Sequence, residues 1–294
     1  MSSVLYDAPG PRARRRELLL SAVAGVVLLA VLFVMYRQLD SREQWAAERW
    51  QVFSDPPLGQ RAEDVWRSLL VTGLLATLKA AAVAAVIAAV LGVVLAIGRM
   101  ATVSWIRLPV IVVIEFFRGL PVVLLMFFGV IALGLPLFWG VVFGLVLYNG
   151  AIVAEILRAG IVSLPKGQTE AAYAIGLTRT QTLFTILLPQ AVRRMLPSLV
   201  SQLVVLNKDT SLGFIIGYAE LLRRLQLNTQ FFGQRYWFQF FVVGTVIYIA
   251  VNFTLSRLAV WLERHGSAKA AGGIPHAEDF FFNDTATTET ATGL

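Results

Sequence analysis

The sequence predicts an all-α integral membrane protein with about six transmembrane helices. Hydrophobic residues make up 57% of the chain and charged residues 15%, whereas a soluble domain carries roughly 25% charged residues. Apolar runs of about 20 residues, long enough to cross a bilayer as a helix, recur along the sequence. The net charge of +7 fits the Lys and Arg enrichment of cytoplasmic loops, so no nucleic-acid partner is expected.

The first apolar run, residues 18–36, follows a basic N-terminal arm, residues 1–17. The run is longer than the apolar region of a signal peptide and lacks a small-x-small cleavage site, so it predicts an uncleaved extra span. Residues 37–68 are polar, mixed in charge and contain Pro56 and Pro57, which predicts an extracytoplasmic loop.

A transmembrane domain is expected at residues 69–264. Its five apolar stretches are interrupted by a polar segment with helical character, residues 158–196, and by an amphipathic outer stretch, residues 220–235. The second stretch contains Arg118, Gly119 and Pro121, which should break its helix. The predicted spans of this domain are Leu69–Ile97, Leu108–Leu133, Leu137–Leu157, Pro197–Tyr218 and Tyr236–Leu262.

Six spans place both termini on one side of the membrane. Thirteen Lys and Arg residues lie in the segments on that side, with Arg257 near the inner end of the last span as a fourteenth, and eight lie in the opposite segments. By the positive-inside rule, both termini are expected in the cytoplasm. Residues 265–294 are rich in Ala, Gly and Thr and predict a disordered tail. Its end, residues 280–289, resembles translated sequencing-adapter sequence rather than a natural terminus.

The most informative segment begins at Glu170. It reads Glu-Ala-Ala, three residues, Gly176, nine residues, Ile186, one residue, Leu-Pro189. A short helix should end at Gly176, which adopts a positive φ without steric cost. Thr178 is then expected to cap a second helix, which Pro189 disturbs or ends. Ala171 and Ala172 would permit close approach of a partner surface.

This spacing resembles the signature of permease subunits in bacterial ABC importers. The resemblance implies that the helix before Gly176 inserts into a separate ATP-binding subunit and transmits its movements. The residues that match the signature, and would carry this contact, are Glu170, Ala171, Ala172, Gly176, Ile186 and Pro189.

Further motifs resemble the polar amino-acid subfamily, a glutamate/glutamine type with a MetI-like transmembrane fold. This similarity covers roughly residues 71–262 and implies an extracytoplasmic solute-binding protein and a second permease subunit, as homodimer or heterodimer. Many relatives have Tyr and Thr or Ser where this chain has Phe116 and Leu120. The motifs are Glu115–Pro121, Asn149–Ala151, Ala154–Ile156, Lys166–Gln168 and Lys208–Leu212.

Charges within the last-but-one span are the first candidates for substrate contacts. Lys208 and Asp209, with Thr210 and Ser211 beside them, interrupt an apolar run, and such charges usually face a cavity or a partner. Asp209 would hold an ammonium group, and Lys208 or nearby donors a carboxylate. The alternative is an interhelical brace between subunits.

Gln202 lies two helical turns before Asp209 on nearly the same face. Relatives that import basic amino acids tend to have Glu at this position, so the resemblance favours glutamate, with glutamine or another neutral or basic amino acid as the alternative. Arg118 and Glu155 are further substrate candidates. Each also belongs to an i,i+3 pair, Glu115 with Arg118 and Glu155 with Arg158, which predicts local charge neutralisation instead.

Catalytic chemistry is not expected. The chain has no Cys, and both histidines, His265 and His276, lie near the C-terminus. No G-x-x-x-x-G-K-[ST] loop occurs to bind ATP phosphates, so ATP and any cofactor would belong to a partner subunit. An ATP-independent channel or uniporter is the rival from another class, and a membrane-embedded enzyme is a weaker one.

Overall fold

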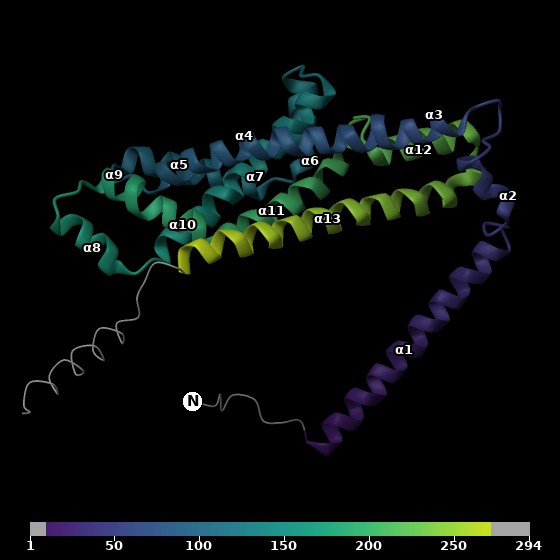
Figure 1. Cartoon of the computed structure of the whole chain (residues 1–294), viewed down its shortest axis with the longest axis horizontal. Helices are drawn as coiled ribbons and strands as arrows, with labels where there is room; N and C mark the ends of the chain where they lie inside the picture. The colour runs from purple at the N-terminus through teal and green to yellow at the C-terminus, as the bar shows by residue number, and fades with distance from the viewer. Residues whose placement is uncertain (1–9, 272–294) are drawn as a thin grey trace, which may run out of the picture. The chain divides into compact units, whose positions relative to one another are not determined.

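The computed structural model describes residues 10–271, in which every regular element is helical (Figure 1). Contacts divide the chain into two units, one made of Met1–Trp66 with Gln226–Val243 and one made of Arg67–Leu225 with Gly244–Leu294. They are described separately. Of the predicted tail, residues 265–271 continue a helix, and the remainder lies outside the described residues, as does the start of the basic arm.

The first unit begins with α1, Pro11–Asp40, which contains the predicted first span. None of its apolar window is buried within the chain, as expected for a helix surrounded by lipid. Two short helices, α2 (Ala47–Trp50) and α3 (Ala62–Trp66), follow with a 3₁₀ turn, Gln51–Phe53, after α2.

The predicted loop, residues 37–68, is folded rather than extended. Its aromatic rings pack edge-on against the start of α13 (Trp237–Ala271), with centroid distances of 5.1 Å for Trp45–Phe238 and 5.2 Å for Phe53–Phe240. The Gln239 amide also donates a 2.7 Å hydrogen bond to the backbone oxygen of Gln44. These contacts build a small aromatic cluster that the sequence alone did not predict.

The second unit contains the remaining helices except residues 226–243, which hold most of the helix Leu221–Phe232 and the start of α13 and belong to the first unit. A π-helical stretch, Arg67–Leu74, begins the second unit, and a 3₁₀ turn, Gln234–Tyr236, leads into α13. The other elements are α4 (Leu75–Arg99), α5 (Ser104–Gly119), α6 (Val122–Phe127), a π-helical turn (Phe128–Ala132), α7 (Leu137–Val162), α8 (Lys166–Ala174), α9 (Arg179–Gln181), a π-helical stretch (Thr182–Leu187), α10 (Leu188–Arg194), α11 (Leu196–Asp209), a 3₁₀ turn (Thr210–Phe214) and α12 (Leu221–Phe232).

Four described helices are long and apolar enough to cross a membrane, and a fifth crossing is possible if α5 and α6 form one span bent by 102°. The predicted interruption near Pro121 is therefore present as a sharp bend. The predicted span Pro197–Tyr218 does not pass as a single helix, because α11 has 14 residues and rises only about 21 Å. With its 3₁₀ extension the segment reaches about 30 Å, so a count of six spans stays a prediction.

The core of the second unit is the contact between α4 and α7. α4 contributes small side chains spaced four residues apart, namely Ala80, Ala84 and Ala88. They are buried against α7 residues such as Val141 and Leu145. Small residues let membrane helices approach closely. Gly144 of α7 shows how closely, because a Cβ there would lie 2.8 Å from the backbone nitrogen of Met126 on α6.

Candidate functional site

The turn after α8 has the geometry expected from its glycine. Gly176 has φ +85°, and the N–H groups of Gly176 and Leu177 donate to the oxygens of Tyr173 and Ala172 at 3.0 and 3.1 Å. These two bonds form a Schellman motif, which ends the helix and redirects the chain. The predicted positive φ at Gly176 is confirmed.

A capping box starts the next helix. The Thr178 hydroxyl accepts from the Gln181 backbone N–H at 3.3 Å, and the Gln181 side chain accepts from the Thr178 N–H at 2.8 Å, as predicted for a helix start. Pro189, however, does not end this helix. It is the second residue of α10, which continues to Arg194. The preceding π-helical stretch contains Ile186 and widens the backbone ahead of the proline.

The two predicted alanines of α8 lie in different environments. Glu170 and Ala171 are exposed and available to a partner, whereas Ala172 is 2% exposed and packs within the chain. A depression of about 460 Å³ lies between α8 and Ile186. The side chains of Gln190 and Gln168 are joined by a 2.6 Å hydrogen bond, so α8 and α10 are held together by a pair that sequence reasoning did not identify.

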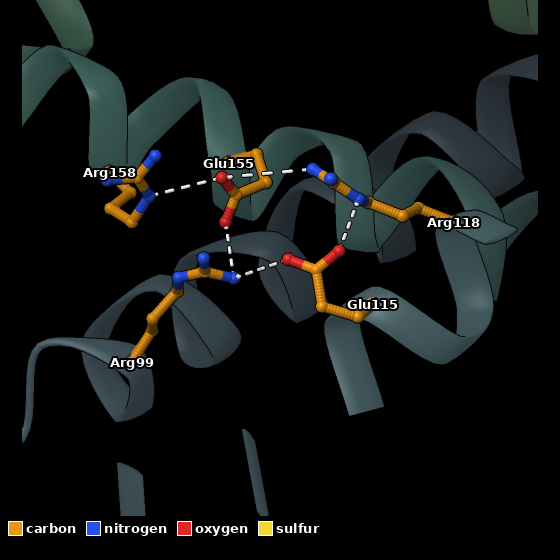
Figure 2. Close-up of polar contacts among 5 residues, drawn as sticks. All are labelled: Arg99, Glu115, Arg118, Glu155 and Arg158. Carbon is orange, nitrogen blue, oxygen red and sulfur yellow. Dashed lines mark hydrogen bonds and ion pairs between the residues drawn. The ribbon is translucent and has the colours of Figure 1, made fainter. Parts of the chain in front are cut away.

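The predicted i,i+3 pairs are both present, at 2.9 Å for Arg118–Glu115 and 3.1 Å for Arg158–Glu155. The structure joins them through Arg99 at the end of α4. One Arg99 guanidinium nitrogen lies 2.6 Å from Glu155 and 3.5 Å from Glu115 (Figure 2). Glu155 and Arg99 are the most buried members, with 17% and 15% of their side chains exposed.

We refer to these five residues as the charged network. Arg118 also faces Glu155, but at 3.9 Å, and its side chain is 44% exposed. The network therefore ties α4, α5 and α7 together with three arginines and two glutamates. Its carboxylates are already paired within the chain, so they are structural groups before they are substrate ligands.

A second polar feature lies on the other side of α7. The Gln202 side-chain amide of α11 donates a 2.7 Å hydrogen bond to the Asn149 side-chain oxygen. Asn149 is fully buried and its own amide donates to the Leu145 oxygen. Because both groups of Asn149 are used, its side chain is fixed, while the Gln202 side chain is only partly buried.

This amide pair faces a cavity of about 410 Å³ between α4, α7, α10 and α11. Asn149 and Gln202 are the only polar side chains in its described lining, and the rest are apolar, among them Ala85, Val153 and Leu199. We call this the amide cavity. Ligand pockets commonly combine an apolar wall with a few fixed polar groups, so the amide cavity is a candidate small-molecule site.

The predicted group at the end of α11 is more spread out. Thr210 and Ser211 donate their hydroxyls to the backbone oxygens of Asn207 and Lys208 at 2.6 and 2.7 Å. Lys208 is exposed and Asp209 is half-buried, and neither side chain forms an ion pair with another described residue. The structure thus separates the predicted substrate residues into the charged network, the amide cavity and this helix end.

Together these features define a multi-pass membrane transport subunit: apolar helices around an intramembrane cavity, with an exposed helix pair beyond the spans. Residues 88–266 match the family of binding-protein-dependent transport system inner membrane components, and the chain belongs to that family.

The chain is 40% identical over 234 residues to a glutamate transport system permease protein, GluD, of Corynebacterium glutamicum, covering 77% of this chain and 82% of that one. It is 38% identical to a probable glutamine ABC transporter permease protein of Bacillus subtilis, covering 67% and 93%. A crystal structure of an amino acid ABC transporter with histidines aligns with a TM-score of 0.62 at 30% identity, over 68% of this chain and 95% of that one. A methionine ABC transporter shares the fold, with a TM-score of 0.53 at 19% identity over 66% and 96%.

Proposed function

We propose that this chain is the non-catalytic permease subunit of an ATP-driven importer for a polar amino acid, with glutamate as the first candidate and glutamine as the second. The observation that carries the proposal is the amide cavity, whose polar groups are fixed by the fold within an otherwise apolar wall. Membership of a binding-protein-dependent transport family and similarity to a glutamate permease support the same function.

The substrate side chain is proposed to bind at the amide pair. Asn149 is held by two hydrogen bonds, whereas the Gln202 carbonyl oxygen accepts no hydrogen bond from another described residue. A neutral amide pair attracts a carboxylate or amide through N–H donors and supplies no negative charge for a basic side chain. This favours glutamate and glutamine over lysine and arginine.

The ammonium and carboxylate of the amino acid need further partners. Asp209 and Lys208 remain the proposed ones, with Thr210 and Ser211 accepting hydrogen bonds through their hydroxyl oxygens. Arg118 is a separate proposed carboxylate partner, on the charged-network side of α7 rather than in the amide cavity, and it is the most loosely attached arginine around Glu155. An interhelical brace made by Lys208 and Asp209 remains the alternative for the end of α11.

ATP binding and hydrolysis are assigned to a separate cytosolic subunit that contacts α8 through Glu170 and Ala171. The rigid turn at Gly176 and the capping box at Thr178 would transmit its movement to α10 and α11. A second permease subunit completes the pathway, and a solute-binding protein delivers the amino acid from outside. No cofactor is assigned to this chain, which we place in a bacterial cytoplasmic membrane with both termini inside.

Transport would proceed by alternating access. Closure of the ATPase subunits shifts the helix pair and exposes the amide cavity to one side and then the other. The shift can be no larger than the difference in affinity of ATP and the binding protein for the two states.

Reconstituted vesicles test the proposal. The chain with its ATPase and binding protein should accumulate labelled glutamate or glutamine only with ATP, in competition with a panel of unlabelled amino acids. ATP-independent flux through the chain alone would instead establish the rival channel or uniporter.

A further inference from the structure

A second cavity, of about 690 Å³, lies beside the exposed face of α8, away from the amide cavity. It is bounded by the connection between α4 and α5, the end of α7, and the segment Thr178–Leu187. Both α4 and α7 are candidate spans that end here, at Arg99 and Val162. The cavity therefore lies at the level where the membrane-crossing helices leave the hydrocarbon.

The charge of this cavity has one sign. Among the described residues that line it, Lys166 and Arg179 are the only charged ones, and none is a carboxylate. Within residues 10–271, neither side chain forms a hydrogen bond or ion pair with another residue. Thr169 and Thr180 add hydroxyl donors to the same lining. Two unpaired cations with neighbouring hydroxyls suit a phosphate group.

Most of the remaining lining is apolar and part of it is exposed. Ile97, Val162 and Phe184 line the cavity, and Val162 and Phe184 are 65% and 46% exposed. A free inorganic anion makes no favourable contact with apolar side chains. A phospholipid can bind the cations through its phosphate and pack its acyl chains against the apolar side. Basic cavities between helices at the cytoplasmic surface bind anionic lipid headgroups for this reason.

The lining residues also distinguish this cavity from the depression next to Ala171. Lys166, Thr169 and Tyr173 line the large cavity, whereas Gly167, Ala171 and Ile175 line the depression. At about 100° per residue, these sets occupy opposite faces of α8. The face with Gly167 and Ala171 is thus left for the ATPase, the opposite face lines this cavity, and Glu170 lies between the two.

We propose that the cavity binds an anionic phospholipid, with its phosphate on Lys166 and Arg179 and an acyl chain along Ile97 and Val162. The bound lipid would support α8 from its membrane side while the ATPase contacts the other side. The inference rests on the proposed function in one respect, the placement of α8 at the cytoplasmic membrane surface.

The test counts lipids on the assembled transporter. The complex of permease and ATPase is taken from nanodiscs of equal phosphatidylglycerol and phosphatidylcholine, and native mass spectrometry measures the lipids retained. Wild type should retain about one phosphatidylglycerol per permease subunit. The double variant Lys166→Gln, Arg179→Gln should bind it roughly 30-fold more weakly, the effect expected of two cations near a membrane surface.

The matched control is Arg14→Gln, Arg16→Gln, which removes two exposed arginines from α1 and should leave the bound phosphatidylglycerol in place. The variant Lys166→Arg, Arg179→Lys keeps both charges and should retain the lipid if folding is intact. Equal retention by wild type and the Gln variant overturns the proposal.

Two other results also overturn it. Loss of the ATPase from the Gln variant with unchanged lipid would assign the cations to the subunit interface. Bound inorganic phosphate on wild type, with no more phosphatidylglycerol than on the Gln variant, would identify a free-anion site. ATP-driven uptake is measured on the same purified complexes reconstituted into vesicles, so absence of uptake from wild type with retained lipid contradicts the proposed function and leaves the lipid site standing.

Discussion

Polar side chains on the two faces of α7 have different kinds of partners. On one face Glu155 is surrounded by Arg99, Arg118 and Arg158, all from the same chain. On the other face the Asn149 side chain accepts a hydrogen bond from Gln202 and donates one to the Leu145 backbone oxygen, beside an apolar cavity. Since Glu155 follows Asn149 by six residues, the helix places them well over 90° apart.

This difference distinguishes polar groups that stabilise the fold from polar groups that can bind a ligand. A partly buried carboxylate with three arginines has little capacity left for a ligand. Removing it would take the carboxylate partner from Arg158 and leave Arg99 and Arg118 to share Glu115. A neutral amide pair costs less to keep in the membrane and still offers unused donors and acceptors. The most conspicuous charges of the sequence are therefore the weaker candidates for substrate binding.

The largest expected effect comes from the charged network. Glu155→Gln leaves Arg99 without its 2.6 Å partner and should destabilise the protein by about 3 kcal/mol, the cost of removing one member of a buried ion pair. Thermal unfolding of the purified protein in detergent measures this. Glu115→Gln is the control, because Glu115 is 44% exposed and should cost less than about 1 kcal/mol.

Equal destabilisation by the two variants would remove the distinction between a buried centre and an exposed edge. A fully stable Glu155→Gln protein that no longer transports would instead make Glu155 a substrate ligand, and the two faces of α7 would exchange roles.

Glu220 differs from both faces of α7, because it is a fully buried carboxylate whose described partners are mainly backbone N–H groups. It accepts hydrogen bonds from the N–H groups of Leu222 and Arg223 at 2.8 and 2.7 Å at the start of α12, outside the candidate spans. Burial raises the pKa of Glu220 to about 7, although these two N–H groups lower it.

The sign of the pH effect follows from that pKa. The folded protein keeps the proton up to about pH 7, whereas the unfolded chain loses it near its ordinary value of 4.5. Stability should therefore fall as the pH rises from 4.5 to 7, by at most about 3 kcal/mol. Unfolding midpoints of wild type and Glu220→Gln across this range provide the measurement. The variant should lack this part of the pH dependence, and identical pH profiles would contradict the raised pKa.

A substitution in the amide cavity should change the substrate preference of the transporter rather than the stability of the protein. Gln202→Glu adds a negative charge beside Asn149 and should weaken glutamate uptake roughly tenfold while improving competition by arginine and lysine. Competition in reconstituted vesicles reports both. Gln230→Glu, the same change at an exposed position of α12, is the control. Unchanged preference in Gln202→Glu would move the substrate site away from the amide cavity.

Local features of the fold were predictable from the sequence. The break near Pro121, the positive φ of Gly176 and the capping box at Thr178 each depend on a few adjacent residues, and all three are present. The i,i+3 pairs were predictable for the same reason. The first expectation about Pro189 was wrong in part, because a π-helical stretch accommodates the proline and lets the helix continue.

Contacts between distant residues were not predictable. The hydrogen bond between Gln202 and Asn149 spans 53 positions, and Arg99 reaches Glu155 from another helix. Periodicity gives the face of each helix but not the rotation of one helix against another. Asn149 was noted only as part of a motif, although an Asn in the middle of an apolar span is itself a signal of a buried hydrogen bond.

The smallest expected effect on stability lies outside both faces of α7. Gly176→Ala forces a Cβ into a φ of +85°, at a cost of about 1 kcal/mol. Gly25→Ala on α1 is the control, since its backbone is helical and a Cβ there meets nothing within 4 Å.

If the turn only transmits movement, Gly176→Ala should lower the amino acid transported per ATP hydrolysed, with substrate preference unchanged and the ATPase still bound. Uptake and hydrolysis measured on the same vesicles give this ratio. An altered preference would mean that the turn also positions the amide cavity, through α10 and α11, and the separation between coupling segment and substrate site would no longer hold.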